Sequence, residues 1–293
     1  MIVAATAIGD AQAPVSIGLV REDGYLVPIA VITPGLFAEP PFPAQTTVHG
    51  EPLDPPVEPD RPSWPFNDLG WTLSYGRGKA PIQIKTLEPL TVDSHCMEQV
   101  VWRTTLKLPP ARKNVAPIYK IGIAVSATGV EHPEDVVNQP DAASRRVVRR
   151  IVALTHSKEA ERLKEIPKNY LPAGASADRQ KVAVRVRLLR RHSAAGVPIY
   201  YFEATKAWGL APEGGLVTGW IVDRPSGMQE HDVKYKFNDD GAKEGDNAIV
   251  WGVIPYDGRA LWILEWHGYE WEYYTVHDWP SGVERLRVDG GGC

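Results

Sequence analysis

The side chains best suited to chemistry lie close together near the C-terminus. The segment LWILEWHGYEWEYYTVHDW, residues 261–279, places four of the ten tryptophans among carboxylates and an imidazole. Two carboxylates are the minimum set for glycoside hydrolysis, in which one acts as the acid and the other as the base or nucleophile. The candidate catalytic residues are therefore Glu265, His267, Glu270 and Glu272.

The spacing of these candidates leaves their separation open. Residues two apart on a strand share a face, so Glu270 and Glu272 are expected on the same side of a sheet. Gly268 can bend the chain between this pair and Glu265, and the distance between the carboxylates is then not predictable. Zinc needs three converging ligands, and this segment has neither an HExxH motif nor paired-histidine spacing. We therefore predict no zinc site and no cofactor.

The aromatic residues of the same segment allow two interpretations. Aromatic rings flanked by carboxylates can stack on sugar rings and bind their hydroxyls. The same rings can instead fill a β core from both faces of a long hairpin, because aromatic residues are favoured in strands. We expect core packing, with one edge exposed, rather than a sugar-binding platform. The candidate ligand-binding residues are Trp262, Trp266, Tyr269, Trp271 and Tyr273.

An acidic segment at residues 238–247, NDDGAKEGDN, offers oxygen ligands of the kind that calcium prefers. Its glycine comes too early for an EF-hand, and no glutamate closes the loop at the required distance. An acidic hairpin turn explains the composition equally well. Calcium binding at Asp239, Asp240 and Asp246 remains the alternative.

The chain has two cysteines, Cys96 and Cys293. In an oxidising compartment they can close one disulfide, which the chain-entropy model values at about 4 to 5 kcal/mol for so long a loop. Three glycines before the last residue let the tail reach a partner, so we expect this disulfide. The alternatives are an intermolecular bridge through Cys293 and a catalytic thiol at Cys96. His95 is adjacent and points to the opposite face of a strand, which leaves only His231 or His277 as a distant base.

Charge and hydropathy exclude several classes of protein. A formal net charge of −4 gives no electrostatic case for binding nucleic acid or an anionic membrane. Apolar residues interrupt the basic cluster of Arg145, Arg146, Arg149 and Arg150, which is typical of the solvated face of an amphipathic element. Phosphate binding by this cluster is the alternative. No stretch approaches the 18 or so consecutive apolar residues of a spanning helix, so we predict no membrane span.

The first thirteen residues have the shape of the end of a secretory signal peptide. The apolar run IVAATAI is followed by Ala-Gln-Ala directly before Pro14, as at a signal peptidase site. A basic n-region is missing, so we interpret residues 1–13 as the remainder of a signal in a truncated precursor. An ordinary first strand or a disordered tail is the alternative. The signal predicts a secreted or periplasmic protein.

Short strand patterns separated by turn residues occupy most of the remaining chain. Asp23-Gly24 joins two apolar runs and supplies the positive φ angles of a tight hairpin turn, and Pro28 places the second strand at an edge or a bulge. Alternating runs such as VAVRVRL at residues 182–188 predict further strands. Residues 34–65 contain ten prolines and are expected to form an extended strap over the domain, with a mobile linker as the alternative.

One helix is predicted among these strands, at residues 141–166. The run SKEAERLKEI is rich in helix formers, Ser157 is the candidate N-cap, and Pro167 ends the element. The preceding RRVVRRIVAL fits either the first turns of this helix or a separate strand. About a dozen short strands and one helix predict a mainly β protein of antiparallel sheets, sandwich or barrel-like. We expect residues 14–293 to form one β-rich domain, or two subdomains that meet near residues 130–170.

These observations lead to two main hypotheses for function. The first is a non-catalytic exported protein, a binding or cell-envelope accessory module whose partner is a glycan or another envelope protein. The second is a secreted hydrolase that acts on glycans through Glu265, Glu270 or Glu272. Two carboxyl groups about 5 to 10 Å apart in an open cleft lined by tryptophan favour the hydrolase, whereas carboxylates scattered on a convex surface exclude it. Assembly through Cys293 or an exposed sheet edge is a third possibility.

Overall fold

The computed structural model describes the greater part of the chain. The described residues are 13–38, 47–48, 51–52, 70–75, 78–83, 90–94, 97–107, 120–126, 129–138, 140–165, 179–208, 211–237, 247–267, 271–279 and 281–292. Several predicted features lie outside these ranges and stay predictions. They are residues 1–12 of the expected signal, most of the proline-rich strap, both cysteines with their disulfide, the calcium candidates Asp239, Asp240 and Asp246, and the site candidates Tyr269 and Glu270.

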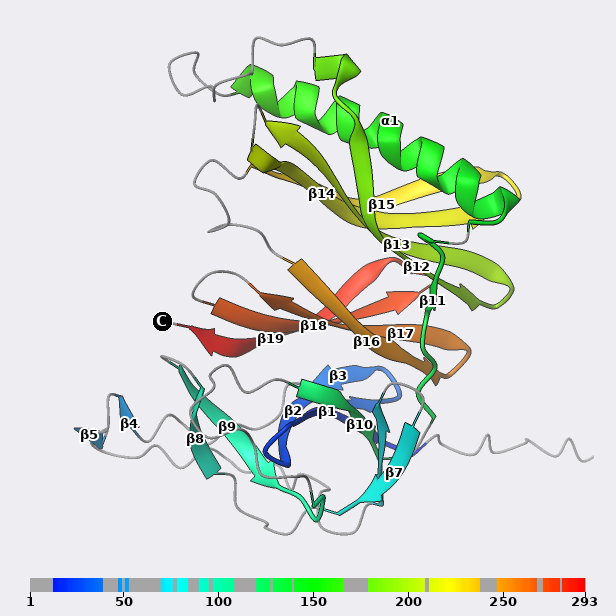
Figure 1. The fold of residues 1–293 in the computed structure, drawn as a ribbon. Helices are drawn as coiled ribbons and strands as arrows, with labels where there is room; N and C mark the ends of the chain where they lie inside the picture. Colours follow the sequence, from blue (N-terminus) through cyan, green and yellow to red (C-terminus); the bar gives the residue numbers. More distant parts are fainter. Residues whose placement is uncertain are drawn as a thin grey trace, which may run out of the picture. The chain divides into compact units, whose positions relative to one another are not determined.

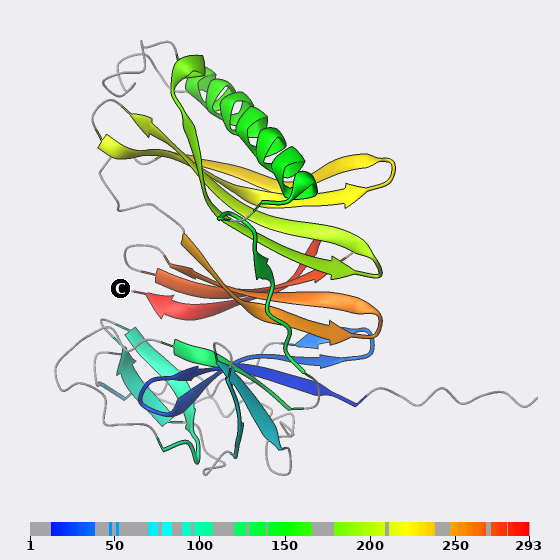
Figure 2. The ribbon, with the colours of Figure 1, turned by 45° about the vertical axis from the view of Figure 1, so that its right-hand side comes forward.

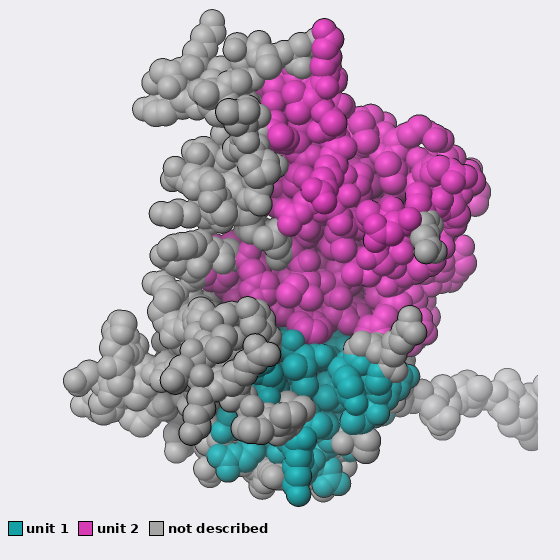
Figure 3. Space-filling view, in the orientation of Figure 1, with its two compact units in different colours: residues 1–130, 285–291 teal, residues 131–284, 292–293 magenta. Residues whose placement is uncertain are grey.

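Antiparallel sheets and a single α-helix make up the described residues, which confirms the predicted mainly β fold class. The chain divides into two compact units (Figure 3). The first contains residues 1–130 and 285–291, and the second contains residues 131–284 and 292–293.

The first unit is built around β1 (Val15–Arg21), a central strand whose residues are all buried. The predicted hairpin between β1 and β2 (Tyr25–Thr33) is confirmed, because Gly24 has a φ of 84° and donates its N–H to the Arg21 carbonyl at 2.9 Å. Pro28 lies opposite Gly18 beside a shift in register, as its missing N–H predicts.

The remaining strands of this unit extend the sheet on both sides of the β1–β2 pair (Figure 1). The sheet order is β7-β6-β10-β1-β2-β9-β8, with β3 paired to β2. The strands are β3 (Leu36–Ala38), β6 (Trp71–Tyr75), β7 (Gly78–Ile82), β8 (Leu90–Ser94), β9 (Met97–Arg103) and β10 (Lys120–Val125), and β4 (Thr47–Val48) pairs separately with β5 (Glu51–Pro52). Trp71 and Trp102 are the largest side chains of the core of this unit.

The second unit places α1 over one face of a five-stranded sheet and a second sheet over the other face (Figures 1 and 2). The five-stranded order is β11-β12-β13-β14-β15, and the second sheet has the order β16-β17-β18-β19, in which residues 285–291 of β19 are assigned to the first unit. The bounds are α1 (Ala142–Glu165), β11 (Glu134–Asp135), the 3₁₀ turn η2 (Arg179–Lys181), β12 (Val184–Ala194), β13 (Val197–Trp208), β14 (Ala211–Arg224), β15 (Gly227–Phe237), β16 (Asn247–Tyr256), β17 (Arg259–His267), β18 (Trp271–Trp279) and β19 (Val283–Gly292).

Each face of the five-stranded sheet buries its own hydrophobic cluster. The inter-sheet core lies between this sheet and the second sheet, and Trp220 is its central ring, with centroids 5.0 Å from both Tyr201 and Trp262. The helix-side core lies under α1. The inter-sheet core comprises Ala194, Ile199, Tyr201, Trp220, Val222, Ala248, Val253, Ala260, Trp262, Leu264, Trp266 and Trp279. The helix-side core comprises Val136, Val147, Ile151, Leu189, Tyr200, Phe202, Ala204, Val217 and Ile221.

The predicted helix is confirmed, and RRVVRRIVAL forms its first turns. Val147 and Ile151, four residues apart, face the helix-side core, while Arg145, Arg146, Arg149 and Arg150 are exposed. The solvated-face interpretation of these arginines is therefore confirmed. Two of them pair with the sheet, Arg146 with Asp223 at 3.0 Å and Arg150 with Glu230.

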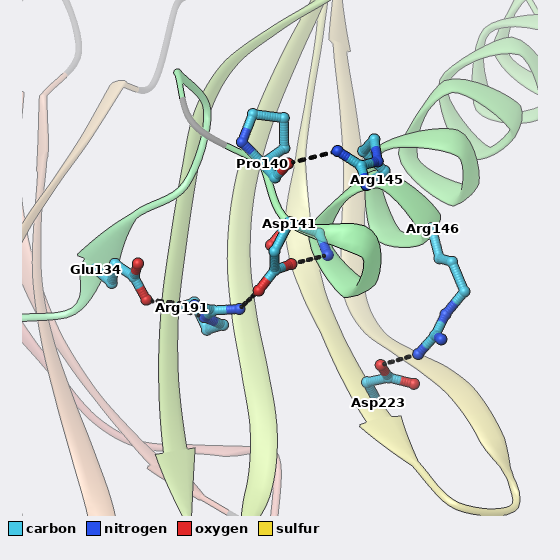
Figure 4. A network of polar contacts seen from close by, with 8 residues as sticks. Glu134, Pro140, Asp141, Arg145, Arg146, Arg191 and Asp223 are labelled. Carbon is cyan, nitrogen blue, oxygen red and sulfur yellow. Dashed lines mark hydrogen bonds and ion pairs between the residues drawn. The ribbon is translucent and has the colours of Figure 1, made fainter.

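The prediction of Ser157 as the N-cap is wrong. Ser157 lies inside α1, where its hydroxyl is 3.3 Å from a Glu161 carboxylate oxygen. The cap is Asp141, whose Oδ1 accepts the Ser144 N–H at 2.7 Å, and whose Oδ2 accepts a 2.6 Å hydrogen bond from Arg191 (Figure 4). The helix begins at Ala142, fifteen residues before Ser157, because burial of its first turns, rather than local helix propensity, fixes its start.

Candidate functional site

The pairing of β17 with β18 brings the predicted chemical residues together. His267 lies directly opposite Glu272, and Glu265 lies opposite Tyr274. Residues two apart on a strand point to the same face, so all four side chains share one face of the hairpin. The structure thus joins three of the four catalytic candidates, and Glu270 lies outside the described residues.

The imidazole of His267 lies between the two carboxylates. Its Nε2 is 3.0 Å from Glu265 Oε1, and its Nδ1 is 3.8 Å from Glu272 Oε2. Each of the three side chains offers a ligand atom, and these atoms all lie within 4.8 Å of one another. The motif spacing of this segment predicted no zinc site. The three potential ligands nevertheless converge in the structure, because the pairing of β17 with β18 brings them together.

The second oxygen of each carboxylate is held by a neighbouring donor. The Trp251 indole N–H donates to Glu265 Oε2 at 2.6 Å, and the Tyr274 hydroxyl donates to Glu272 Oε1. Trp251 reaches Glu265 because the register of β16 against β17 shifts between Val250 and Gly252. A bulge of this kind re-aims a side chain.

Burial makes this arrangement electrostatically demanding. The side chains of Glu265 and Glu272 are 1% and 9% exposed, whereas His267 is 39% exposed. A buried carboxylate is costly unless a cation or hydrogen bonds compensate its charge. The three side chains together carry −2 with a neutral imidazole and −1 with an imidazolium, so a divalent cation is a matching charge.

The tryptophan candidates face away from these carboxylates. Trp262 and Trp266 are buried in the inter-sheet core, and the Trp266 indole N–H donates to Thr275 Oγ1 at 2.8 Å. Core packing is therefore confirmed for these two rings, and they cannot form part of an exposed sugar platform. Trp271 and Tyr273 are half-buried and stack at 5.1 Å and 20°, and the Lys236 ammonium lies 5.7 Å from the Trp271 centroid.

The two histidines considered as a distant base also belong to the packed interior of the second unit. His277 is 5.1 Å from Trp220, and His231 lies edge-on to Trp279 at 5.3 Å. Cys96, which they were to activate, lies outside the described residues. Nothing in the described part of the chain therefore supports a catalytic thiol.

A second polar cluster lies between α1 and the sheet. Lys206 of β13 pairs with Glu159 of α1, and its ammonium lies 2.8 Å from His156 Nδ1. Arg179 also donates to the Glu159 carboxylate, at 2.5 Å. Lys206 and Glu159 are fully buried, and burial lowers the pKa of His156. Because Glu159 of α1 bonds to Lys206 of the sheet and to Arg179, this cluster links α1 to the sheet.

No helix among the described residues combines the length and the apolarity of a transmembrane span. Comparison with known proteins adds no relative to these observations: no protein-family model, no curated protein and no solved structure matches the chain.

Proposed function

We propose that the protein is a non-catalytic binding protein whose binding centre is Glu265, His267 and Glu272, and that its ligand is a divalent transition-metal ion. The observation that carries this proposal is the convergence of three ligand atoms within 4.8 Å. The second oxygen of each carboxylate accepts a hydrogen bond, from Trp251 for Glu265 and from Tyr274 for Glu272. Such outer hydrogen bonds orient carboxylate ligands in metal sites.

The donor set favours zinc over calcium or magnesium. Calcium takes six to eight oxygen ligands and magnesium a near-octahedral oxygen shell, whereas zinc is bound by mixed nitrogen and oxygen ligands. Three protein ligands leave a fourth zinc position for water or another small ligand. The exposure of His267, the outermost of the three, is consistent with such an open position.

The contrast between the two faces of the hairpin supports binding over glycan hydrolysis. A glycosidase needs two carboxyl groups flanking an open sugar site. Glu265 and Glu272 are buried and share one imidazole, and the rings of Trp262 and Trp266 lie on the opposite face of the strands. We retain a secreted or periplasmic location as part of the proposal, supported by the apolar run and Ala-Gln-Ala before Pro14. The macromolecular partner expected from the sequence, a glycan or another envelope protein, stays a prediction.

Calorimetric titration of the metal-stripped full chain with Zn²⁺ tests the proposal. We expect one ion per chain, and loss of this binding in His267→Gln, because the only nitrogen ligand is removed. The matched control is His132→Gln, which changes an exposed histidine outside the cluster and should bind zinc like the parent chain. Circular dichroism verifies that each variant is folded. Absence of stoichiometric zinc binding, or equal binding by His267→Gln, would overturn the proposal.

A further inference from the structure

A cleft with a volume of about 340 Å³ lies in the second unit, at the opposite end of β17 from His267. Its walls come from the β12–β13 turn, the β16–β17 turn and Glu131. Glu131 is fixed in place by two backbone hydrogen bonds with Val253, both 2.8 Å long. The cleft is therefore independent of the proposed metal centre.

Both turns that form the cleft are tight. Ala195 and Gly196 have φ angles of 48° and 75°, and Asp257 and Gly258 have φ angles of 50° and 69°. Two successive left-handed residues are the signature of a type I′ hairpin turn, which matches the twist of its strands. The walls are thus held by short backbone connections, and their side chains have defined positions.

The cationic side chain in this cleft is already matched. Arg259 Nη1 lies 3.1 Å from Asp278 Oδ2, and the Asp278 side chain is buried. The guanidinium therefore compensates a carboxylate that has been removed from water. Arg259 and Asp278 together therefore carry no net charge toward a ligand in the cleft.

The remaining acidic side chains keep a net negative charge. Burial lowers the pKa of His192, so its imidazole is neutral at pH 7. Its Nε2 lies 3.5 Å from Glu131 Oε2, beyond a normal hydrogen bond. Asp257 also lines the cleft, and among the described residues neither it nor Glu131 forms an ion pair with a lysine or an arginine.

We propose that this cleft binds a small organic cation that carries a primary ammonium group. Glu131 and Asp257 supply the negative charge from two different walls, and the neutral His192 supplies an acceptor nitrogen. His192 is held edge-on against Trp262, with centroids 6.2 Å apart, so its ring is already oriented. The volume is near the lower end of the roughly 300–1,000 Å³ range of ligand pockets, which fits a short-chain amine.

Titration with 1-butylamine, followed by the NMR signals of the His192 ring, tests this proposal. The full chain is kept in a chelator at neutral pH, so failure of the metal proposal does not affect the result. We expect saturable shifts of the His192 signals with butylamine and none with butyrate. Glu131→Gln and Asp257→Asn should each weaken butylamine binding about fivefold, because the loss of an exposed ion pair costs roughly 1 kcal/mol of binding free energy.

Asp135→Asn is the matched control for charge. Asp135 is an exposed carboxylate of β11 that pairs with Arg190 at 3.3 Å and does not line the cleft, so its loss should leave butylamine binding unchanged. Equal binding of butyrate and butylamine would overturn the proposal. So would the absence of saturable shifts, or Glu131→Gln and Asp257→Asn variants that bind butylamine like the parent chain.

Discussion

Trp251 shows how one extra residue in a strand changes the chemistry of its neighbour. The register of β16 shifts around this residue, and its indole N–H then meets the buried carboxylate of Glu265 at 2.6 Å. The hydrogen bond occupies Oε2, while Oε1 stays near His267. Trp251 is thus a positioning residue for the proposed metal centre.

The variant Trp251→Phe removes this donor and keeps most of the ring. We expect the zinc Kd measured by calorimetry to rise about tenfold, the lower end of the 10–100-fold effect of losing an outer hydrogen-bond partner. Trp271→Phe changes a ring on the opposite face of the hairpin and should leave the Kd unchanged. An unchanged Kd in Trp251→Phe would show that the indole does not orient Glu265.

The residue types of the candidate site were predictable, and their meeting was not. Glu265, His267 and Glu272 were identified because carboxylates and an imidazole lie close together in one aromatic segment. Their convergence depends on the register that pairs His267 with Glu272, which no local pattern specifies. Trp251 and Tyr274 were not identified, because a bulge and a cross-strand position are visible only once the strands are paired.

At the scale of an element, a carboxylate defines the N-terminus of α1. Asp141 accepts the Ser144 N–H through one oxygen and the Arg191 guanidinium through the other. The backbone hydrogen bond from Ser144, followed by the bond from Arg191, holds the pKa of Asp141 well below its usual value. Arg191 also pairs with Glu134, so the helix start, β11 and β12 are tied to one guanidinium (Figure 4).

The pH dependence of stability tests this cap. Asp141→Ala should lower the urea midpoint, and Asp141→Asn should fall between it and the parent chain, because it keeps a capping oxygen and loses the charge. Since the folded pKa is lowered, the contribution of the charged form is complete above the ordinary carboxyl pKa of 3.8 and declines at lower pH. The difference between the parent chain and Asp141→Asn should therefore shrink between pH 7 and about pH 3. A constant difference would contradict the charge pairing with Arg191.

Local rules predicted the elements unevenly. Asp23-Gly24 predicts its turn because glycine adopts positive φ without steric cost, and the hairpin is present with Gly24, but not Asp23, at positive φ. Residues 145–154 could not be assigned, because their β-branched residues fit a strand while their spacing fits a helix. Contacts of Val147 and Ile151 with the helix-side core decide in favour of the helix, and these contacts are tertiary.

At the scale of the whole molecule, long-range pairing decides what local patterns cannot. Residues 285–291 cluster with the first unit although they follow the second along the chain. Within the second unit, β13 supplies side chains to two cores, Tyr201 to the inter-sheet core and Phe202 to the helix-side core. The two cores therefore share one strand, and loss of packing in one is expected to destabilise the other.

The variant Phe202→Ala tests whether the two cores unfold together. Truncating a buried phenylalanine should lower the free energy of unfolding by about 3–5 kcal/mol. Urea unfolding followed by tryptophan fluorescence should shift as much as unfolding followed by far-UV circular dichroism, since Trp220, Trp262 and Trp279 lie in the other core. Ile249→Ala, at an exposed position, should cost about 0.5 kcal/mol or less. An unmoved fluorescence midpoint in Phe202→Ala would mean that the cores unfold independently.

The burial of both faces of β13 also creates a hazard during synthesis. Ile199, Tyr200, Tyr201 and Phe202 are consecutive and each fully buried, so they form an uncharged, strand-prone run. While the partner strands are still missing, such a run is a template for self-association. Pro198 and Glu203 flank it directly, and residues of these types act as gatekeepers against aggregation. The strand that joins the two cores is thus also the segment on which misfolding would start, and its two neighbours are where the sequence limits that risk.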